Sequence, residues 1–138
     1  MIALDTNVLV RAIVGDDAEQ AAAAQARLLT LTTREPGFVT HIVLVELWWV
    51  LTRSYKYSSA QALIPVEQLC QTAAILVQDP VLVAQAIAAV RDNGADFADA
   101  LIVAISKNAG CASIETFDKG AIKHAGMSPL TTRGRAEH

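Results

Sequence analysis

The chain has 138 residues, of which 53% are hydrophobic, and a net charge of −3 at pH 7. A chain of this length suits one domain that buries about 68% of the surface of its unfolded state. The acidic balance excludes a protein that holds nucleic acid by net charge alone, so any contact with nucleic acid has to be local.

The first residues predict a short buried strand that turns directly into a helix. An apolar run after the initial methionine is broken by Asp5, Thr6 and Asn7 and resumes as Val-Leu-Val. Asp5 is therefore expected at the carboxyl end of a strand, the edge at which open α/β sheets bind ligands. A carboxylate at that edge needs either a cation or hydrogen-bond donors, because burial without a partner is costly.

Helices and strands alternate along the rest of the chain. Apolar spacing and turn residues predict helices over residues 7–14, 18–33, 41–55, 58–72, 81–92 and 119–125, with another that opens at Asp96 and closes at Asn108. Short strands are expected over residues 38–40, 73–78 and 111–117, and a strand remnant with a polar tail over residues 128–138. This pattern predicts one α/β domain, residues 1–138, with a central parallel sheet flanked by helices.

Charge and cysteine spacing indicate where such a chain works. Charged residues interrupt every window of about 18 residues, and Asp5 and Arg11 break any signal-peptide pattern. We therefore expect a soluble, cytoplasmic protein without a membrane segment. Cys70 and Cys111 lack metal-ligand spacing and are expected to be reduced thiols in the core.

The helix over residues 41–55 carries one acid, Glu46, in an otherwise apolar run. A helix that is apolar all round is buried on most of its circumference. Glu46 is therefore expected to face other protein and to need a partner. Trp48 and Trp49 are adjacent, so they point about 100° apart and cannot both face one core.

Several acids occupy equivalent positions in the predicted fold. Asp5 and Asp118 end strands, and Asp96 and Asp99 open a helix. If the strands are parallel, the acids at their ends meet at one edge of the sheet, where their repulsion raises some pKa values. A bound Mg²⁺ or Mn²⁺ relieves this repulsion, since both ions prefer oxygen ligands. Such a site suits hydrolysis of phosphodiester bonds by a metal-activated water.

Each acid also has a purely structural alternative. Asp96 with Asp99 three residues later resembles a capping box, and Asp118 could cap the last helix. Asp5 could form an Asx turn, and Glu46 could pair with Arg11 or another base. One shared cause explains acids at corresponding positions more simply than separate structural roles do.

Smaller polar residues and cations accompany these acids. Thr6, Asn7 and Thr116 lie beside them in sequence and could hydrogen-bond them or a bound water, although turn chemistry explains Asn7 and Thr116 equally well. The candidates for local phosphate contacts are Arg11, Arg53 and Lys119.

Four segments of the chain together resemble the PIN-domain ribonucleases, most closely the VapC-like toxins of bacterial type II toxin-antitoxin pairs. The segments are Leu4-Asp5-Thr6-Asn7-Val8-Leu9-Val10-Arg11, Leu44-Val45-Glu46-Leu47-Trp48-Trp49-Val50-Leu51, Asp96-Phe97-Ala98-Asp99-Ala100-Leu101-Ile102 and Thr116-Phe117-Asp118-Lys119. Each segment alone is a weak signal, whereas all of them in order at suitable separations form a strong one.

The resemblance implies a three-layer PIN-like fold and metal-dependent endonucleolytic cleavage of RNA. It implies Mg²⁺ or Mn²⁺ held by Asp5, Asp99 and Asp118, with Glu46 as a ligand or as a base that orients the attacking water. Asp118 then serves a second or more loosely held ion, and the role of Asp96 as a further ligand stays open. The resemblance also implies a homodimer and an antitoxin partner whose C-terminal segment enters the acidic groove.

Two other classes of protein fit parts of the pattern. Phosphatases that form an aspartyl-phosphate also begin with an aspartate at the end of the first strand, but they carry a second aspartate where this chain has Asn7. A non-catalytic PIN-like interaction module would keep the fold, although the full set of acids argues against it.

Overall fold

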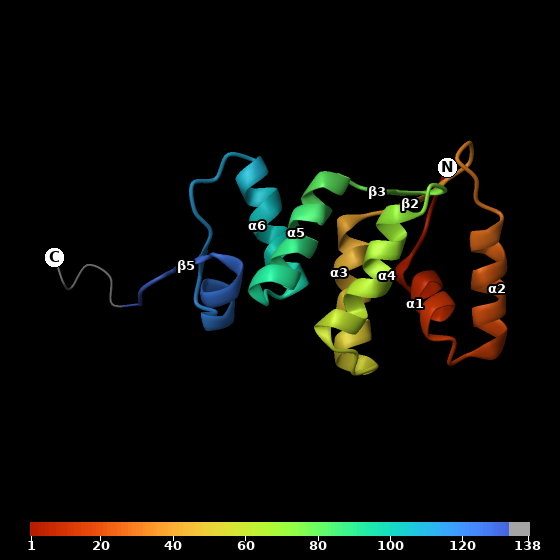
Figure 1. The fold of residues 1–138 in the computed structure, drawn as a ribbon, viewed down its shortest axis with the longest axis horizontal. Helices are drawn as coiled ribbons and strands as arrows, with labels where there is room; N and C mark the ends of the chain where they lie inside the picture. The colour runs from red at the N-terminus through yellow and green to blue at the C-terminus, as the bar shows by residue number, and fades with distance from the viewer. Residues whose placement is uncertain (133–138) are drawn as a thin grey trace. The chain divides into compact units, whose positions relative to one another are not determined.

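The structure is a computed structural model, and it describes residues 1–132. The end of the predicted polar tail, residues 133–138, lies outside the described residues. The chain divides into two compact units, Met1–Pro80 and Val81–His138, which we describe separately (Figure 1). The expectation of a single domain over residues 1–138 stays a prediction.

The first unit is built on a parallel sheet of short strands. Its elements are β1 (Ile2–Ala3), α1 (Thr6–Val14), α2 (Ala18–Leu29), β2 (Gly37–Val39), α3 (His41–Trp49), the π-helical turn η1 (Val50–Ser54), α4 (Ser59–Gln71) and β3 (Ile75–Val77). β2 lies between β1 and β3, with Ile2 opposite Gly37 and Gly37 opposite Ile75. The predicted α/β class, with helices around a parallel sheet, is confirmed.

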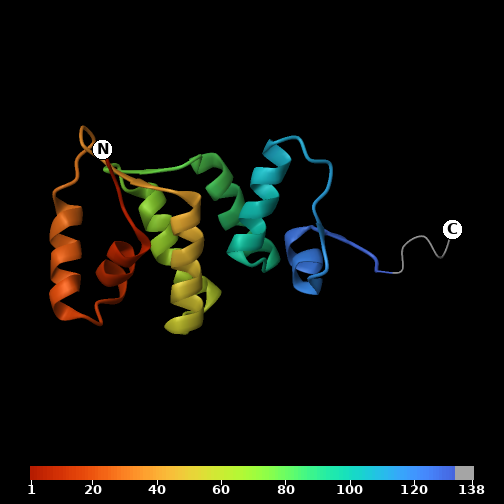
Figure 2. The ribbon, with the colours of Figure 1, turned by 180° about the vertical axis from the view of Figure 1, so that it is seen from behind.

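Local sequence sets the ends of the first two helices. Gly15 ends α1 with φ of 72°, a left-handed conformation that glycine adopts without steric cost. Asp17 then caps α2 by accepting a hydrogen bond from the Gln20 backbone N–H at 3.0 Å. α2 ends at Leu29, earlier than the predicted residue 33, where the Thr30 hydroxyl donates to the Arg27 carbonyl at 2.6 Å. The two helices lie side by side in both views (Figures 1 and 2).

Helix α3 is buried on one side only. Its buried side chains are His41, Val43, Leu44, Leu47 and Trp48. Ile42 and Trp49 are exposed by 72% and 39%, so the prediction of a helix buried on most of its circumference is wrong. Its uniform apolar composition concealed which side packs against α1 and α4. Trp48 and Trp49 do face different surroundings, as predicted.

The regular part of α3 gives way to the π-helical turn η1. The Thr52 hydroxyl donates to the Trp48 carbonyl at 2.8 Å, a bond that competes with the helical ladder. α4 then starts from a full capping box made by Ser58 and Gln61. It runs through the buried Pro65 as one helix, so Pro65 does not divide it.

The second unit contains two longer helices and a small parallel sheet. Its elements are α5 (Pro80–Asn93, starting at the last residue of the first unit), α6 (Phe97–Asn108), β4 (Glu115–Thr116), the π-helical turn η2 (Ala121–Ala125) and β5 (Ser128–Pro129). β4 pairs with β5, and Glu115 lies opposite Ser128. The strand predicted over residues 111–117 is thus much shorter, because only Glu115 and Thr116 find a paired neighbour.

The structure also tests the predictions for the two cysteines and for a membrane segment. Both cysteines are free thiols. Burial raises the pKa of the Cys70 thiol, and the negative charge of the nearby Glu67 raises it further. Cys111 is exposed, so its predicted place in the core is wrong. Over the described range, none of the helices combines the length and the apolar character needed to cross a membrane.

Candidate functional site

Asp5 stands where β1 leads into α1. It occupies the N-cap position of α1 with extended backbone angles, φ −81° and ψ 159°. Its carboxylate makes no cap hydrogen bond and is exposed to solvent. Among residues 1–132 it has no hydrogen-bonding or ionic partner, so the alternative of an Asx turn does not describe it. The carboxylate is free to meet a ligand.

Thr6 connects the start of α1 to Glu46 on α3. Its buried hydroxyl donates a hydrogen bond of 2.7 Å to Glu46 Oε1. Glu46 itself is exposed, so the prediction that it would be buried is wrong, and its recorded partner is Thr6 instead of an arginine. The bond from Thr6 holds the side chain of Glu46 in place. Because a hydroxyl group neutralises no charge, the carboxylate of Glu46 can still act on a ligand.

In the second unit Asp96 has the structural role that its spacing indicated. It is the N-cap of α6, and its Oδ2 accepts a hydrogen bond of 3.1 Å from the Asp99 backbone N–H. This bond orients the first turn of α6, which carries Asp99. Asp96 thus positions Asp99 whether or not it also binds a ligand.

The carboxyl group of Asp99 lies in an unfavourable environment for a negative charge. It is half-buried, and desolvation raises its pKa above the ordinary value. The neighbouring charges of Asp96 and Asp118 raise the pKa further. A bound cation would remove the repulsion and favour the ionised form.

Asp118 follows β4 and opens the turn into η2. Its Oδ1 accepts hydrogen bonds from the backbone N–H groups of Gly120 at 2.8 Å and Ala121 at 3.2 Å. Its own backbone N–H donates to the Thr116 hydroxyl at 3.0 Å. The capping alternative therefore accounts for one oxygen of Asp118, and the other accepts no hydrogen bond in the part of the chain that the structure describes.

The chemistry of these donors fits a hard divalent cation. All five candidates, Asp5, Glu46, Asp96, Asp99 and Asp118, offer carboxylate oxygens, which suit Mg²⁺ and Mn²⁺. Within either unit, over residues 1–132, no three histidine, cysteine or acidic side chains gather closely enough to hold a metal ion. The fit to a cation therefore rests on the carboxylate oxygens as metal ligands and on the negative charges of Asp96 and Asp118 near Asp99.

Asp96→Asn is expected to lower the pKa of Asp99 in the metal-free protein. The substitution removes one neighbouring negative charge, and asparagine still caps α6. Desolvation remains, so the pKa of Asp99 should stay above its ordinary value. Carbon-detected NMR titration of the Asp99 carboxyl group measures this shift. Asp92→Asn, on the exposed end of α5, is the matched control, and an unchanged pKa in Asp96→Asn would contradict the described coupling.

The predicted cationic candidates differ in how they are held. Arg11 forms an ion pair of 3.0 Å with Asp16 and a hydrogen bond of 2.7 Å with Gln20. Arg53 stacks over the exposed Trp49, 5.0 Å from the ring centre. Sequence reasoning missed Asp16 and Gln20 as partners of Arg11, although Asp16 lies in the short connection after α1 and Gln20 in the first turn of α2.

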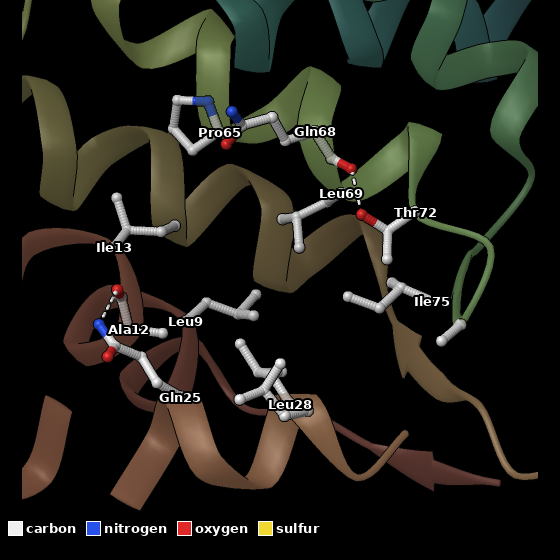
Figure 3. A pocket seen from close by; sticks show the side chains of 12 residues that line it. Leu9, Ala12, Ile13, Gln25, Leu28, Pro65, Gln68, Leu69, Thr72 and Ile75 are labelled. Carbon is white, nitrogen blue, oxygen red and sulfur yellow. Dashed lines mark hydrogen bonds between the residues drawn. The ribbon is translucent and has the colours of Figure 1, made fainter. Parts of the chain in front are cut away.

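A pocket of about 580 Å³ in the first unit is chemically unlike this site (Figure 3). Leu9 and Ile13 from α1, Leu28 from α2 and Leu69 from α4 form much of its wall. No acidic side chain lines it. Its apolar wall cannot hold a metal ion or a phosphate.

Comparison with models of known protein families gives a match over most of the chain. The family model described as PIN domain matches residues 2–127. No curated protein matches the chain.

Proposed function

This chain belongs to the PIN domain family, and on that basis we propose that it is an endoribonuclease that hydrolyses RNA phosphodiester bonds with a divalent cation. PIN domains are generally metal-dependent nucleases. The observation that carries the proposal is the exposed carboxylate of Asp5, which has no partner among residues 1–132 and is followed directly by the threonine that orients Glu46. An oxygen-rich site of this kind suits a cation and a phosphate better than an uncharged substrate.

We assign the ligand role to Asp5 and Asp99, with Asp118 and Asp96 as further candidates. Bound Mg²⁺ or Mn²⁺ supplies positive charge for the phosphate and lowers the pKa of a bound water. Asp5 brings an oxygen that no cap bond occupies. Asp99 brings a carboxyl group that desolvation and two neighbouring acids predispose to accept a cation.

Glu46 is proposed to orient the attacking water and to accept its proton. The Thr6 hydroxyl holds Glu46 Oε1 and leaves the other oxygen, Oε2, to face a ligand. A general base must lie within hydrogen-bond reach of the proton that it removes, so a fixed carboxylate is more effective than a mobile one. Asp118, fixed by two backbone N–H groups, is proposed to serve a second or more loosely held ion.

The biological role we propose is that of the toxin in a toxin-antitoxin pair, acting in the cytoplasm as a homodimer. The support is the resemblance of four ordered segments of the chain to VapC-like toxins. Its cognate antitoxin would be the second protein partner. Brief expression in a bacterial host without the antitoxin, followed by sequencing of RNA 5′ ends, should reveal new cleavage ends, and their absence would contradict a toxin role.

Purified protein is expected to cleave single-stranded RNA in Mg²⁺ or Mn²⁺ and to lose this activity in EDTA. Unpaired RNA is the expected substrate because its backbone can enter a cleft. The measurement is cleavage of labelled structured and unstructured RNA, resolved by gel electrophoresis. Cleavage that persists in EDTA would contradict the proposal, and trapping of an acyl-phosphate on Asp5 would favour the phosphatase alternative.

A further inference from the structure

One face of α3 carries a row of exposed side chains that begins at Glu46. Trp49, the last residue of α3, follows Glu46 by three positions, and Arg53 follows Trp49 by four, in the π-helical turn η1. Residues three or four apart lie on the same side of a helix, one above the other. Trp49 and Arg53, which we call the Trp–Arg pair, therefore continue the face of Glu46 over about 10 Å.

The two side chains of the Trp–Arg pair are in contact with each other. The guanidinium carbon of Arg53 lies 5.0 Å from the centre of the Trp49 ring, within the range of a cation–π interaction. The N–H groups of a guanidinium in such a contact can still donate to an anion. The Thr52 hydroxyl donates to the Trp48 carbonyl at 2.8 Å and thereby anchors the turn that carries Arg53. The pair is thus held in place without a ligand.

Both members of the pair are open to solvent. The exposed fraction of Trp49 is 39%, although tryptophan is on average a highly buried residue. Arg53 is exposed, and apart from its contact with Trp49 it makes no hydrogen bond or ion pair among residues 1–132. Its charge is therefore uncompensated. A flat ring beside a free cation, on the face of Glu46, suits a ligand with a flat part and an anionic part.

Single-stranded RNA fits this face better than an apolar protein surface does. An apolar partner would bury the charges of Glu46 and Arg53 without counter-charges, which is costly. RNA supplies a base that can stack on an exposed indole ring and a phosphate that can accept hydrogen bonds from a guanidinium. Unpaired RNA also leaves its bases free for such stacking.

We propose that the Trp–Arg pair binds single-stranded RNA next to the cleaved bond, with one base stacked on Trp49 and a phosphate held by Arg53. The inference rests on the proposed function, in which Glu46 orients the attacking water. It names how an acidic protein holds its polyanionic substrate. Because stacking and phosphate contacts tolerate every base, the pair positions the strand and does not select its sequence.

The test measures binding of labelled single-stranded RNA by fluorescence anisotropy at several salt concentrations and constant Mg²⁺, in the full chain carrying Asp5→Asn to prevent cleavage. Trp49→Leu should bind roughly tenfold more weakly with an unchanged salt dependence, because stacking releases no counterions. Arg53→Gln should also bind roughly tenfold more weakly, and the slope of log affinity against log salt should become shallower by about 0.7. Arg34→Gln, at an exposed position outside α3, is the matched control and should change neither.

Trp49→Phe distinguishes base stacking from a contact with another protein. Phenylalanine keeps an aromatic face, so this variant should retain most of the affinity that Trp49→Leu loses, although both replacements are apolar. Size-exclusion chromatography gives the oligomeric state of each variant, and circular dichroism gives its helix content. Equal losses in the two Trp49 variants, or a loss that appears only with a change of oligomeric state, would mark this face as a protein contact and overturn the inference.

A kinetic measurement separates this inference from the proposed function. With Asp5 intact, Trp49→Leu and Arg53→Gln should each raise KM with little change in kcat, because these contacts are made equally in the ground and transition states. If the unmutated protein cleaves RNA while either variant keeps its affinity and KM, the inference is overturned and the proposed function stands. If the unmutated protein cleaves no RNA in Mg²⁺ or Mn²⁺, both are overturned.

Discussion

Replacing Asp5 with asparagine is expected to lower kcat/KM for RNA cleavage by roughly a thousandfold, since removing a charged ligand takes several kcal/mol from the stabilisation of the transition state. The carboxylate is exposed and makes no cap bond, so its loss should not disturb α1. Cleavage of a labelled RNA under single-turnover conditions in Mn²⁺ measures the effect, and circular dichroism checks the helix content.

Asp17→Asn is the matched control for this substitution. Asp17 is likewise an N-cap aspartate, but its side chain accepts a hydrogen bond from Gln20 N–H. Asparagine caps helices as well as aspartate does, so the control should keep both fold and activity. Full activity in Asp5→Asn would refute the assignment of Asp5 as a metal ligand.

Leu47→Ala is expected to reduce the free energy of unfolding by about 3 kcal/mol, the typical cost of a large cavity in a core. Leu47 is fully buried on the side of α3 that packs in the first unit. It follows Glu46 directly, so loosening α3 should also disturb the bond from Thr6 to Glu46. Urea unfolding followed by tryptophan fluorescence gives the change in free energy.

The exposed face of the same helix provides the comparison. Ile42 is 72% exposed, and Ile42→Ala should change the free energy of unfolding by less than about 0.5 kcal/mol. Equal losses in Leu47→Ala and Ile42→Ala would mean that α3 packs through a different side. The contrast between the two variants thus tests the orientation of α3, and with it the exposure of Glu46.

Patterns confined to a few neighbouring residues were predictable from the sequence. The change from strand to helix around Asp5 and the capping role of Asp96 both depend on neighbours within three residues. Ser58 opens α4 close to the predicted position for the same reason. These local predictions hold in the folded chain because neighbouring residues determine the backbone geometry at a helix end.

Features that depend on distant contacts were not predictable. Glu46 was expected to be buried because α3 is apolar all round, and only packing determines which side faces outward. Tyr55 holds Asp16 across 39 residues, a pairing without a local signal.

At the N-cap of α1, thermal stability and ligand binding place opposite demands on the side chain of Asp5. A capping side chain typically stabilises a helix by about 1 kcal/mol, and the carboxylate of Asp5 forgoes that gain. A serine that turned its hydroxyl to the first amides of α1 would add the missing cap bond and raise the melting temperature. Selection for thermal stability alone should therefore replace Asp5 and yield inactive variants, as is common where stability and activity conflict at one residue.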